Sequence, residues 1–275
     1  MKKMSIMIVK TAIMGIFALA FLLPLLWMVS SSLKTPMQVF QYPFQWIADR
    51  IQWSNYVKVW LFNEIPFYRL YLNSLFISVI SVMGQILVSS LAAYAFAKIN
   101  FKGKNIVFII MLITMMIPVQ VMIIPRYMLF KTLSLYNTLW SVILPNFFSV
   151  TSIFLLRQFY MTLPDALVEA SRIDGATHFT IWVKIMMPLT KNAMISAAVL
   201  AFINSWNEYL NPLIFLPSKK LYTVPLGIRW YLEDIAKEYN LMMAAAASAI
   251  IPIVIIYMCA QNFFEEGIAT AGVKG

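Results

Sequence analysis

Long stretches without a charged side chain divide this chain into segments of similar length. Five of them, each enclosed between two charged residues, are long enough to cross about 30 Å of hydrocarbon at about 1.5 Å per helical residue. A sixth stretch carries one charge, Glu208. The predicted spans are residues 11–33, 70–97, 105–125, 132–156, 192–216 and 240–264.

These stretches favour helices over the strands of a barrel. Lipid offers no hydrogen-bond partner to a bare backbone, so a spanning segment is either a helix or part of a closed barrel. The stretches lack the alternation of apolar and polar residues that a barrel strand shows. With 61% hydrophobic and 12% charged residues, the chain also lacks the polar surface that a water-facing globule needs. The sequence therefore predicts an all-α polytopic membrane protein with six transmembrane helices in a single transmembrane domain, residues 1–275.

The charges and the rare residues exclude several classes of protein. The net charge is +10, but the 21 Lys and Arg residues are scattered between apolar runs and form no basic stripe for nucleic acid. The single cysteine, Cys259, and the single histidine, His178, cannot build a zinc or haem centre without carboxylates or a partner chain. We therefore expect no nucleic-acid partner, no metal site and no cofactor bound by this chain.

Two lysine-rich segments indicate the orientation in the membrane. Six spans place both termini on one side, and the total count of Lys and Arg hardly separates the two sides. The N-terminal segment and the short loop 98–104, however, each hold three lysines and no acid. This local excess predicts that the N- and C-termini, together with the loop between the fourth and fifth spans, are cytoplasmic.

The loop between the fourth and fifth spans, residues 157–191, is polar and its pattern predicts two short helices. Thr162 is suited to cap the first helix, and Asp165 complements its positive end. Gly175 can adopt the left-handed conformation that ends a helix, and a second helix follows over residues 177–187. The apolar face of the first helix is expected to consist of Leu163, Leu167 and Ala170. From these residues alone, a helix lying on the lipid interface is equally compatible.

The spacing within this loop resembles the EAA loop of ABC-transporter permease subunits, whose pattern is E-A-A-x3-G-x9-I-x-L-P. The matching residues are Glu169, Ala170, Ser171, Gly175, Ile185, Met187 and Pro188. Serine replaces the second alanine and methionine replaces the leucine, and both changes are mild. Further segments resemble the carbohydrate-type, maltose-transporter-like permeases, specifically the six-span partner of the permease pair: Ile173-Asp174-Gly175-Ala176, the run 204–209 and the tail 266–275.

The resemblance implies a permease subunit of an ATP-driven ABC importer for sugars or oligosaccharides. In that family the loop forms a coupling helix that sits in a cleft of a cytoplasmic ATPase subunit and transmits the closure of the ATPase pair to the spans. The residues expected to couple to the ATPase are Glu169, Ala170, Ser171, Asp174, Gly175 and Pro188. Contacts of the C-terminal tail with the ATPase are expected at Gly267, Gly272 and Lys274.

The resemblance also implies the other components of such an importer. These are a second permease subunit in a heterodimer, two copies of an ATPase subunit that bind ATP and Mg²⁺, and an extracytoplasmic sugar-binding protein, assembled at the bacterial plasma membrane. The chain agrees in lacking a phosphate-binding loop, because Gly103-Lys104-Asn105 has neither the earlier glycine nor the hydroxyl of G-x4-G-K-[ST]. We therefore expect no catalytic residue and no enzyme activity in this chain.

Glu208 is the most unusual single residue, because an acid within a span is costly and usually faces a bundle interior or water. Amides and aromatic rings surround it in sequence, a combination suited to a sugar path. The candidate path residues are Asn204, Trp206, Asn207, Glu208 and Tyr209. The alternative is that Glu208 forms a structural pair with a partner subunit or lies at the outer water interface.

Other functions are less well supported by the residues. A glycerol-phosphate-type importer is the alternative within the family, because members of similar sequence serve both substrates. A stand-alone secondary transporter needs its own coupling site and often two related halves, and here only Glu208 is available. A membrane enzyme needs a nucleophile and base or a metal cluster, and His178 has no obvious partner for such chemistry.

Overall fold

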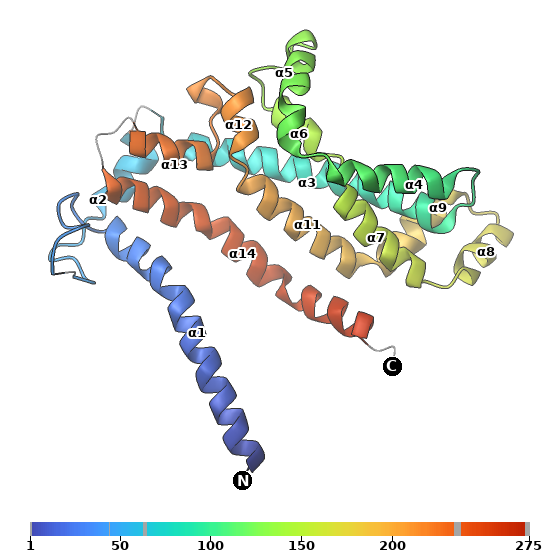
Figure 1. The fold of residues 1–275 in the computed structure, drawn as a ribbon, viewed down its shortest axis with the longest axis horizontal. Coiled ribbons are helices and arrows are strands. Elements are labelled where there is room, and N and C mark those ends of the chain that lie inside the picture. Colours follow the sequence, from blue (N-terminus) through green and yellow to red (C-terminus); the bar gives the residue numbers. More distant parts are fainter. Residues whose placement is uncertain (1, 44, 63–64, 234–237, 273–275) are drawn as a thin grey trace. The chain divides into compact units, whose positions relative to one another are not determined.

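The computed structural model describes residues 2–43, 45–62, 65–233 and 238–272, and each regular element within these ranges is a helix (Figure 1). The chain divides into two compact units, which are described separately. The first unit comprises Met1–Tyr71 and Val224–Pro252, and the second comprises Leu72–Thr223 and Ile253–Gly275. Two of the three boundaries between the units fall within long helices, α3 (Phe67–Lys98) and α14 (Tyr239–Gly272), and the third lies between Thr223 and Val224.

The first unit is organised around the C-terminal end of its first helix. Its elements, besides the ends of α3 and α14, are α1 (Lys2–Ser32), α2 (Ser54–Val57), the π-helix η1 (Lys58–Phe62) and α13 (Val224–Glu233). The buried Asn55 side chain donates to the carbonyl oxygens of Ser32, at 2.8 Å, and Lys34, at 2.9 Å. Asn240 donates to the Asn55 Oδ1 atom at 3.1 Å. These amides satisfy carbonyl groups that the end of a helix leaves without a partner.

The second unit contains the remaining helices. Helices α7 and α11 run beside α3, and α8 and α9 lie near one end of it (Figure 1). The elements are α4 (Lys104–Ile113), η2 (Thr114–Met116), η3 (Val119–Met122), α5 (Ile123–Thr132), α6 (Trp140–Asn146), α7 (Val150–Thr162), α8 (Ala166–Ile173), α9 (His178–Ile181), the π-helix η4 (Trp182–Met186), α10 (Met187–Leu189), α11 (Lys191–Trp206), α12 (Leu210–Phe215) and η5 (Lys219–Leu221).

Within the described residues, four helices are long and apolar enough to cross a membrane, and the number rises to six if each of two bent helix pairs is one span. The prediction of an all-α protein with several membrane helices is confirmed. The four are Ile6–Ser32, Phe67–Lys98, Trp140–Thr162 and Tyr239–Phe263. The third of these starts at Trp140, eight residues after the predicted start of the span at residue 132, because the chain first turns at Ser134 and Asn137, which have φ of 56° and 59°.

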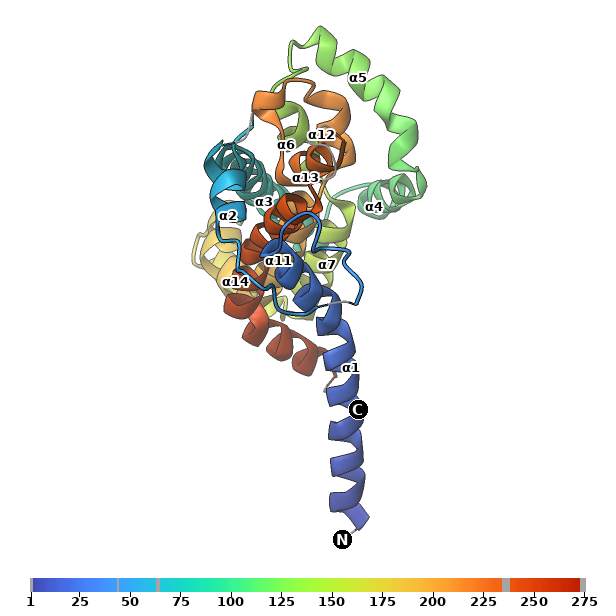
Figure 2. The ribbon, with the colours of Figure 1, turned by 90° about the vertical axis from the view of Figure 1, so that its left-hand side faces the viewer.

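The predicted span 105–125 is not continuous in the structure. Lys104–Met116 and Val119–Thr132 meet at 93°, and Figure 2 shows the corner between α4 and α5. Pro118 lies at the corner, and Ile117 before it is extended, with φ −79° and ψ 116°. A proline ring disfavours the helical conformation of the preceding residue, which explains the break. The predicted span 192–216 is also interrupted, because α11 ends at Trp206 and α12 follows.

Candidate functional site

Helix α8 carries three of the six residues that the sequence assigned to coupling, Glu169, Ala170 and Ser171, and its C-terminal end is a Schellman motif. The Gly175 N–H donates to the Arg172 carbonyl at 3.0 Å, and the Ala176 N–H donates to the Ser171 carbonyl at 2.9 Å. Gly175 has φ of +81°, whereas a Cβ atom built on it meets nothing within 4 Å. The backbone conformation, and not a lack of space, therefore favours glycine at this position.

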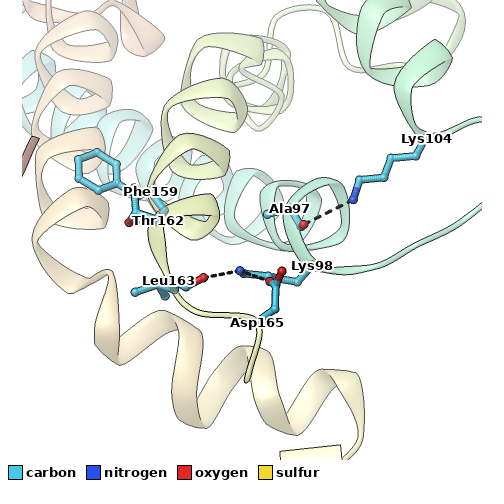
Figure 3. Close-up of polar contacts among 7 residues, drawn as sticks. All are labelled: Ala97, Lys98, Lys104, Phe159, Thr162, Leu163 and Asp165. Carbon is cyan, nitrogen blue, oxygen red and sulfur yellow. Dashed lines mark hydrogen bonds and ion pairs between the residues drawn. The ribbon is translucent and has the colours of Figure 1, made fainter. Parts of the chain in front are cut away.

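The start of α8 differs from the predicted one. Thr162 does not cap α8, because it is the last residue of α7 and its hydroxyl donates to the Phe159 carbonyl at 2.8 Å. The residue before α8 is Asp165, whose side chain makes no capping bond. Its carboxylate is held by Lys98 instead, at 2.5 Å, and the same ammonium donates to the Leu163 carbonyl at 2.6 Å (Figure 3). Lys98 thus ties the end of α3 to the turn between α7 and α8.

The ion pair with Lys98 lowers the pKa of the Asp165 carboxyl group. The hydrogen bond from Lys98, followed by the positive charge of Lys98, holds the pKa of Asp165 below its ordinary value of 3.8. The Lys98 side chain is 3% exposed, and that of Asp165 is 78% exposed. Because one partner is solvated, the pair contributes only about 0.2–1 kcal/mol, the range measured for exposed pairs.

The predicted apolar stripe of α8 is wrong in its phase. Val168 is the residue that the helix buries, at 7% exposure, whereas Leu167 and Ala170 are exposed. Leu163 is half-buried, but it precedes the helix in an extended conformation, with φ −77° and ψ 139°. Because Leu163 is outside the helix, the spacing from it to Leu167 and Ala170 does not place the three on one helical face.

The second part of the loop anchors the site to three helices. Trp182 is 2% exposed and its Nε1–H donates to the Ser90 hydroxyl at 2.9 Å. Ser90 also shares a hydrogen bond of 2.8 Å with the Tyr160 hydroxyl, and Tyr94 shares one of 3.0 Å with His178 Nδ1. The buried cluster around these contacts comprises Ala93 and Tyr94 of α3, Leu156 and Tyr160 of α7, Val168, Ile181, Trp182, Met186, and Ala193 and Ala197 of α11.

The outward face of α8 combines charges with an uncovered apolar side chain. Glu169, Ala170 and Asp174 are exposed, and Ile173 is 87% exposed. Ser171 is half-buried and its hydroxyl donates to the Leu167 carbonyl at 2.7 Å. Pro188, the remaining predicted coupling residue, is exposed in α10, after η4.

The predicted path residues surround the break between α11 and α12. Trp206 departs from the expectation, because its ring is 2% exposed and stacked on Phe202, with centroids 5.7 Å apart. It belongs to the core of the unit. Asn204 and Asn207 are exposed, and the Asn207 amide donates to the Ile203 carbonyl at 2.9 Å.

Glu208 and Tyr209 are half-buried at this break. Glu208 Oε1 accepts a 3.0 Å hydrogen bond from the backbone N–H of Asn211, at the start of α12. The carboxylate thereby satisfies a donor that the helix leaves open and lies where its charge is favourable. Arg126 of α5, which the sequence did not single out, donates to Asn211 Oδ1 at 3.2 Å. Glu208 therefore has a structural role within this chain.

The predicted tail contacts lie at the end of the last helix. Gly267 and Gly272 are within α14, whereas Lys274 lies outside the described residues. Among the residues that the structure describes, no group of three or more His, Cys, Asp or Glu side chains is placed to hold a metal ion.

Residues 85–270 match the family described as "binding-protein-dependent transport system inner membrane component". The chain is 37% identical over 218 residues to the arabinooligosaccharides transport system permease protein of Halalkalibacterium halodurans, covering 79% of this chain and 78% of the relative. It is 34% identical over 261 residues to the protein of the same name from Bacillus subtilis, covering 94% and 92%.

Two further similarities extend over nearly the whole chain. The sn-glycerol-3-phosphate transport system permease protein of Pectobacterium atrosepticum is 34% identical over 262 residues, covering 93% of this chain and 92% of the relative. Among solved structures, one chain of a bacterial ABC transporter involved in the import of the acidic polysaccharide alginate is similar with a TM-score of 0.81. That chain is 25% identical, and the match covers 94% of this chain and 95% of the other.

Proposed function

Because the chain belongs to the family of inner membrane components of binding-protein-dependent transport systems, we propose that it is a permease subunit of an ABC importer for oligosaccharides. The observation that carries this proposal is the similarity to two arabinooligosaccharide permeases, at 37% and 34% identity. In this role the chain transmits motion and lines a pathway, while the ATP and Mg²⁺ are bound by a separate ATPase subunit.

The partners in this proposal are a second permease subunit, two copies of the ATPase subunit and an extracytoplasmic sugar-binding protein. The termini and the α8 loop face the cytoplasm, in agreement with the lysines of the N-terminal segment and of loop 98–104. The ATPase docks on α8 through Glu169, Ala170, Ser171, Asp174 and Gly175, with Pro188 at the far end of the loop. The tail residues Gly267, Gly272 and Lys274 add a second contact with the ATPase.

The contacts beneath α8 support a rigid transmission of motion. Lys98 joins the turn before α8 to α3, and Trp182 joins the segment after it to Ser90 of the same helix. Packed interiors deform little, so a displacement of α8 is passed to α3 and α7 and is not absorbed in the loop. Closure of the ATPase pair then moves the spans as bodies and alternates access to the pathway.

The first prediction concerns the pH dependence of the Lys98–Asp165 pair at the start of α8. The folded-state pKa of Asp165 is depressed, so its contribution to stability is present above the ordinary value of 3.8 and is lost as the pH falls through the folded-state pKa. We expect Asp165→Asn to weaken hydrogen-exchange protection of α8 roughly two- to fivefold at pH 7. The wild-type protection, corrected for intrinsic rates, should stay constant from pH 7 to 4.5, and a steady loss across that range would contradict the pairing.

The second prediction concerns the pathway, which we propose passes Asn204, Asn207, Glu208 and Tyr209. Glu208→Gln keeps an acceptor for the Asn211 N–H but removes the charge that faces Arg126. We expect the variant to assemble normally and to transport with a KM raised about 3- to 30-fold. A neutral amide binds a substrate hydroxyl more weakly than a carboxylate does. Substrate uptake is measured in proteoliposomes that contain the whole importer. Unaltered kinetics would leave Glu208 with its structural role alone.

The function itself is tested by purification from the native membrane in mild detergent, followed by mass spectrometry of the associated chains. We expect a second permease and an ATPase, and ATP-dependent uptake of arabinose oligosaccharides after reconstitution with the binding protein. Glycerol 3-phosphate is the alternative substrate, favoured by the 34% identity to a glycerol-3-phosphate permease over 93% of the chain. Recovery of the chain alone, still active without ATP, would replace the proposal with a secondary transporter.

A further inference from the structure

A cavity of about 510 Å³ opens where α3, α4 and α7 come together. Its wall includes Phe96 and Phe101, before and after the end of α3, Lys104 at the start of α4, and Arg157 and Met161 near the end of α7. Helix α3 ends at Lys98 and α7 at Thr162, whereas α4 begins at Lys104. Ends of apolar helices mark the depth at which lipid headgroups lie, so the cavity lies at headgroup depth.

The two cations of this cavity retain unused hydrogen-bond donors. Arg157 uses Nε in a 3.3 Å bond to the Phe96 carbonyl, and its guanidinium lies 4.1 Å from the centroid of the Phe108 ring. Lys104 makes one long bond, 3.4 Å, to the Ala97 carbonyl (Figure 3). An arginine has five donors and a lysine three, so both retain donors after these bonds.

Asp165, the nearby acid, forms its ion pair with Lys98 and not with Lys104 or Arg157. The one ion pair in the part of the chain that the structure describes joins Lys98 to Asp165. Figure 3 shows the two lysines at the same end of α3 but directed differently, Lys98 to Asp165 and Leu163, and Lys104 to Ala97. The cavity therefore keeps two positive charges, from Lys104 and Arg157.

A phosphate group suits these charges, because guanidinium and ammonium groups bind its oxygens through charge-assisted hydrogen bonds. The wall also has an aromatic and aliphatic part, formed by Phe96, Phe101, Ile106 and Met161, beside the amides of Asn100 and Asn105. Free phosphate gains nothing from such a wall, whereas an acyl chain or glycerol backbone attached to the phosphate does. Basic pockets between membrane helices are known sites for acidic lipid headgroups.

We propose that this cavity between α3, α4 and α7 binds the phosphate of an anionic phospholipid, with Lys104 and Arg157 as its ligands. The bound phosphodiester places one negative charge between the two cations beside the Lys98–Asp165 pair, which reduces their mutual repulsion and thereby stabilises the end of α3 to which α8 is tied. This inference concerns the chain and its lipid, and it holds whichever substrate is transported.

The test measures retention of phosphatidylglycerol by the purified importer in phosphatidylcholine nanodiscs, using native mass spectrometry. We expect the wild type to retain phosphatidylglycerol. Lys104→Gln removes one positive charge and should lower retention roughly fivefold, the factor that one basic side chain contributes near an anionic surface. The Lys104→Gln/Arg157→Gln double variant removes two charges and should lower retention roughly 25-fold. Equal retention by the double variant and the wild type would overturn the proposal.

The matched control is Lys102→Gln, which removes an exposed cation from the same short loop but not from the wall of the cavity. This variant should retain the lipid as the wild type does, and a loss equal to that of Lys104→Gln would contradict a specific site. Lys104→Arg preserves the charge and should retain the lipid, even if Lys104→Gln folds poorly. An excess of inorganic phosphate is the last arm, because displacement of the lipid by free phosphate at millimolar concentration would assign the cavity to free phosphate instead.

Discussion

Gly175→Pro is expected to lower transport at least about tenfold while the chain still inserts into the membrane. Proline fixes φ near −65°, whereas Gly175 has φ of +81° and donates its N–H to the Arg172 carbonyl. The substitution therefore removes the Schellman motif and misdirects α8, and a change of about 1.4 kcal/mol in the docking of α8 already amounts to tenfold. Transport and ATP hydrolysis are measured separately, because uncoupling lowers transport more than hydrolysis.

The control for this prediction is Gly175→Asn. Asparagine tolerates the left-handed conformation better than other residues with a side chain, and the added atoms meet open space. We expect this variant to retain most of the transport. Normal uptake by a well-expressed Gly175→Pro variant would show that the end of α8 does not carry the coupling.

The second large effect is expected at Trp182, which joins the α8 loop to the spans. Trp182→Ala leaves a cavity inside the buried cluster and removes the donor to Ser90. Truncation of a buried tryptophan costs about 3–5 kcal/mol. We expect thermal unfolding of the purified importer to begin at a lower temperature, with proteolysis appearing first at Arg172 and Lys184 of the loop.

Trp182→Phe separates the two contributions, because it keeps most of the ring volume and loses only the hydrogen bond. Ser90 still has Tyr160 as a partner, so the expected cost is about 0.5–1.5 kcal/mol. If Trp182→Ala unfolds and is digested like the wild type, the loop does not depend on this anchor, and the rigid connection from α8 to α3 is wrong.

Four membrane helices and the end of α8 were predictable because their signals are local. A stretch without charges indicated each of these four helices, and glycine at 175 indicates a left-handed stop within one turn of the chain. The phase of α8 was predicted wrongly because Thr162 and Leu163 look like a helix start, whereas the Lys98 ammonium holds the turn in another conformation.

The anchors of the site were not predictable from sequence, because each joins distant positions. Ser90 and Trp182 are 92 residues apart, and Lys98 and Asp165 are 67 apart. The bends have a similar origin, since a proline at 118 is compatible with both a mild kink and a corner of 93°. The sequence contains no signal that distinguishes the two at this position.

The open space around Gly175 shows which property of glycine is needed at this position. No atom of this chain lies within 4 Å of the missing Cβ, so the constraint that the chain itself imposes concerns the handedness of the α-carbon and not bulk. A D-amino acid, which adopts positive φ without strain, would satisfy this constraint while carrying a full side chain. Ribosomal synthesis uses only L-amino acids and glycine, and glycine alone among them is achiral. At this corner glycine is thus favoured because it is achiral, and its small size is not the reason.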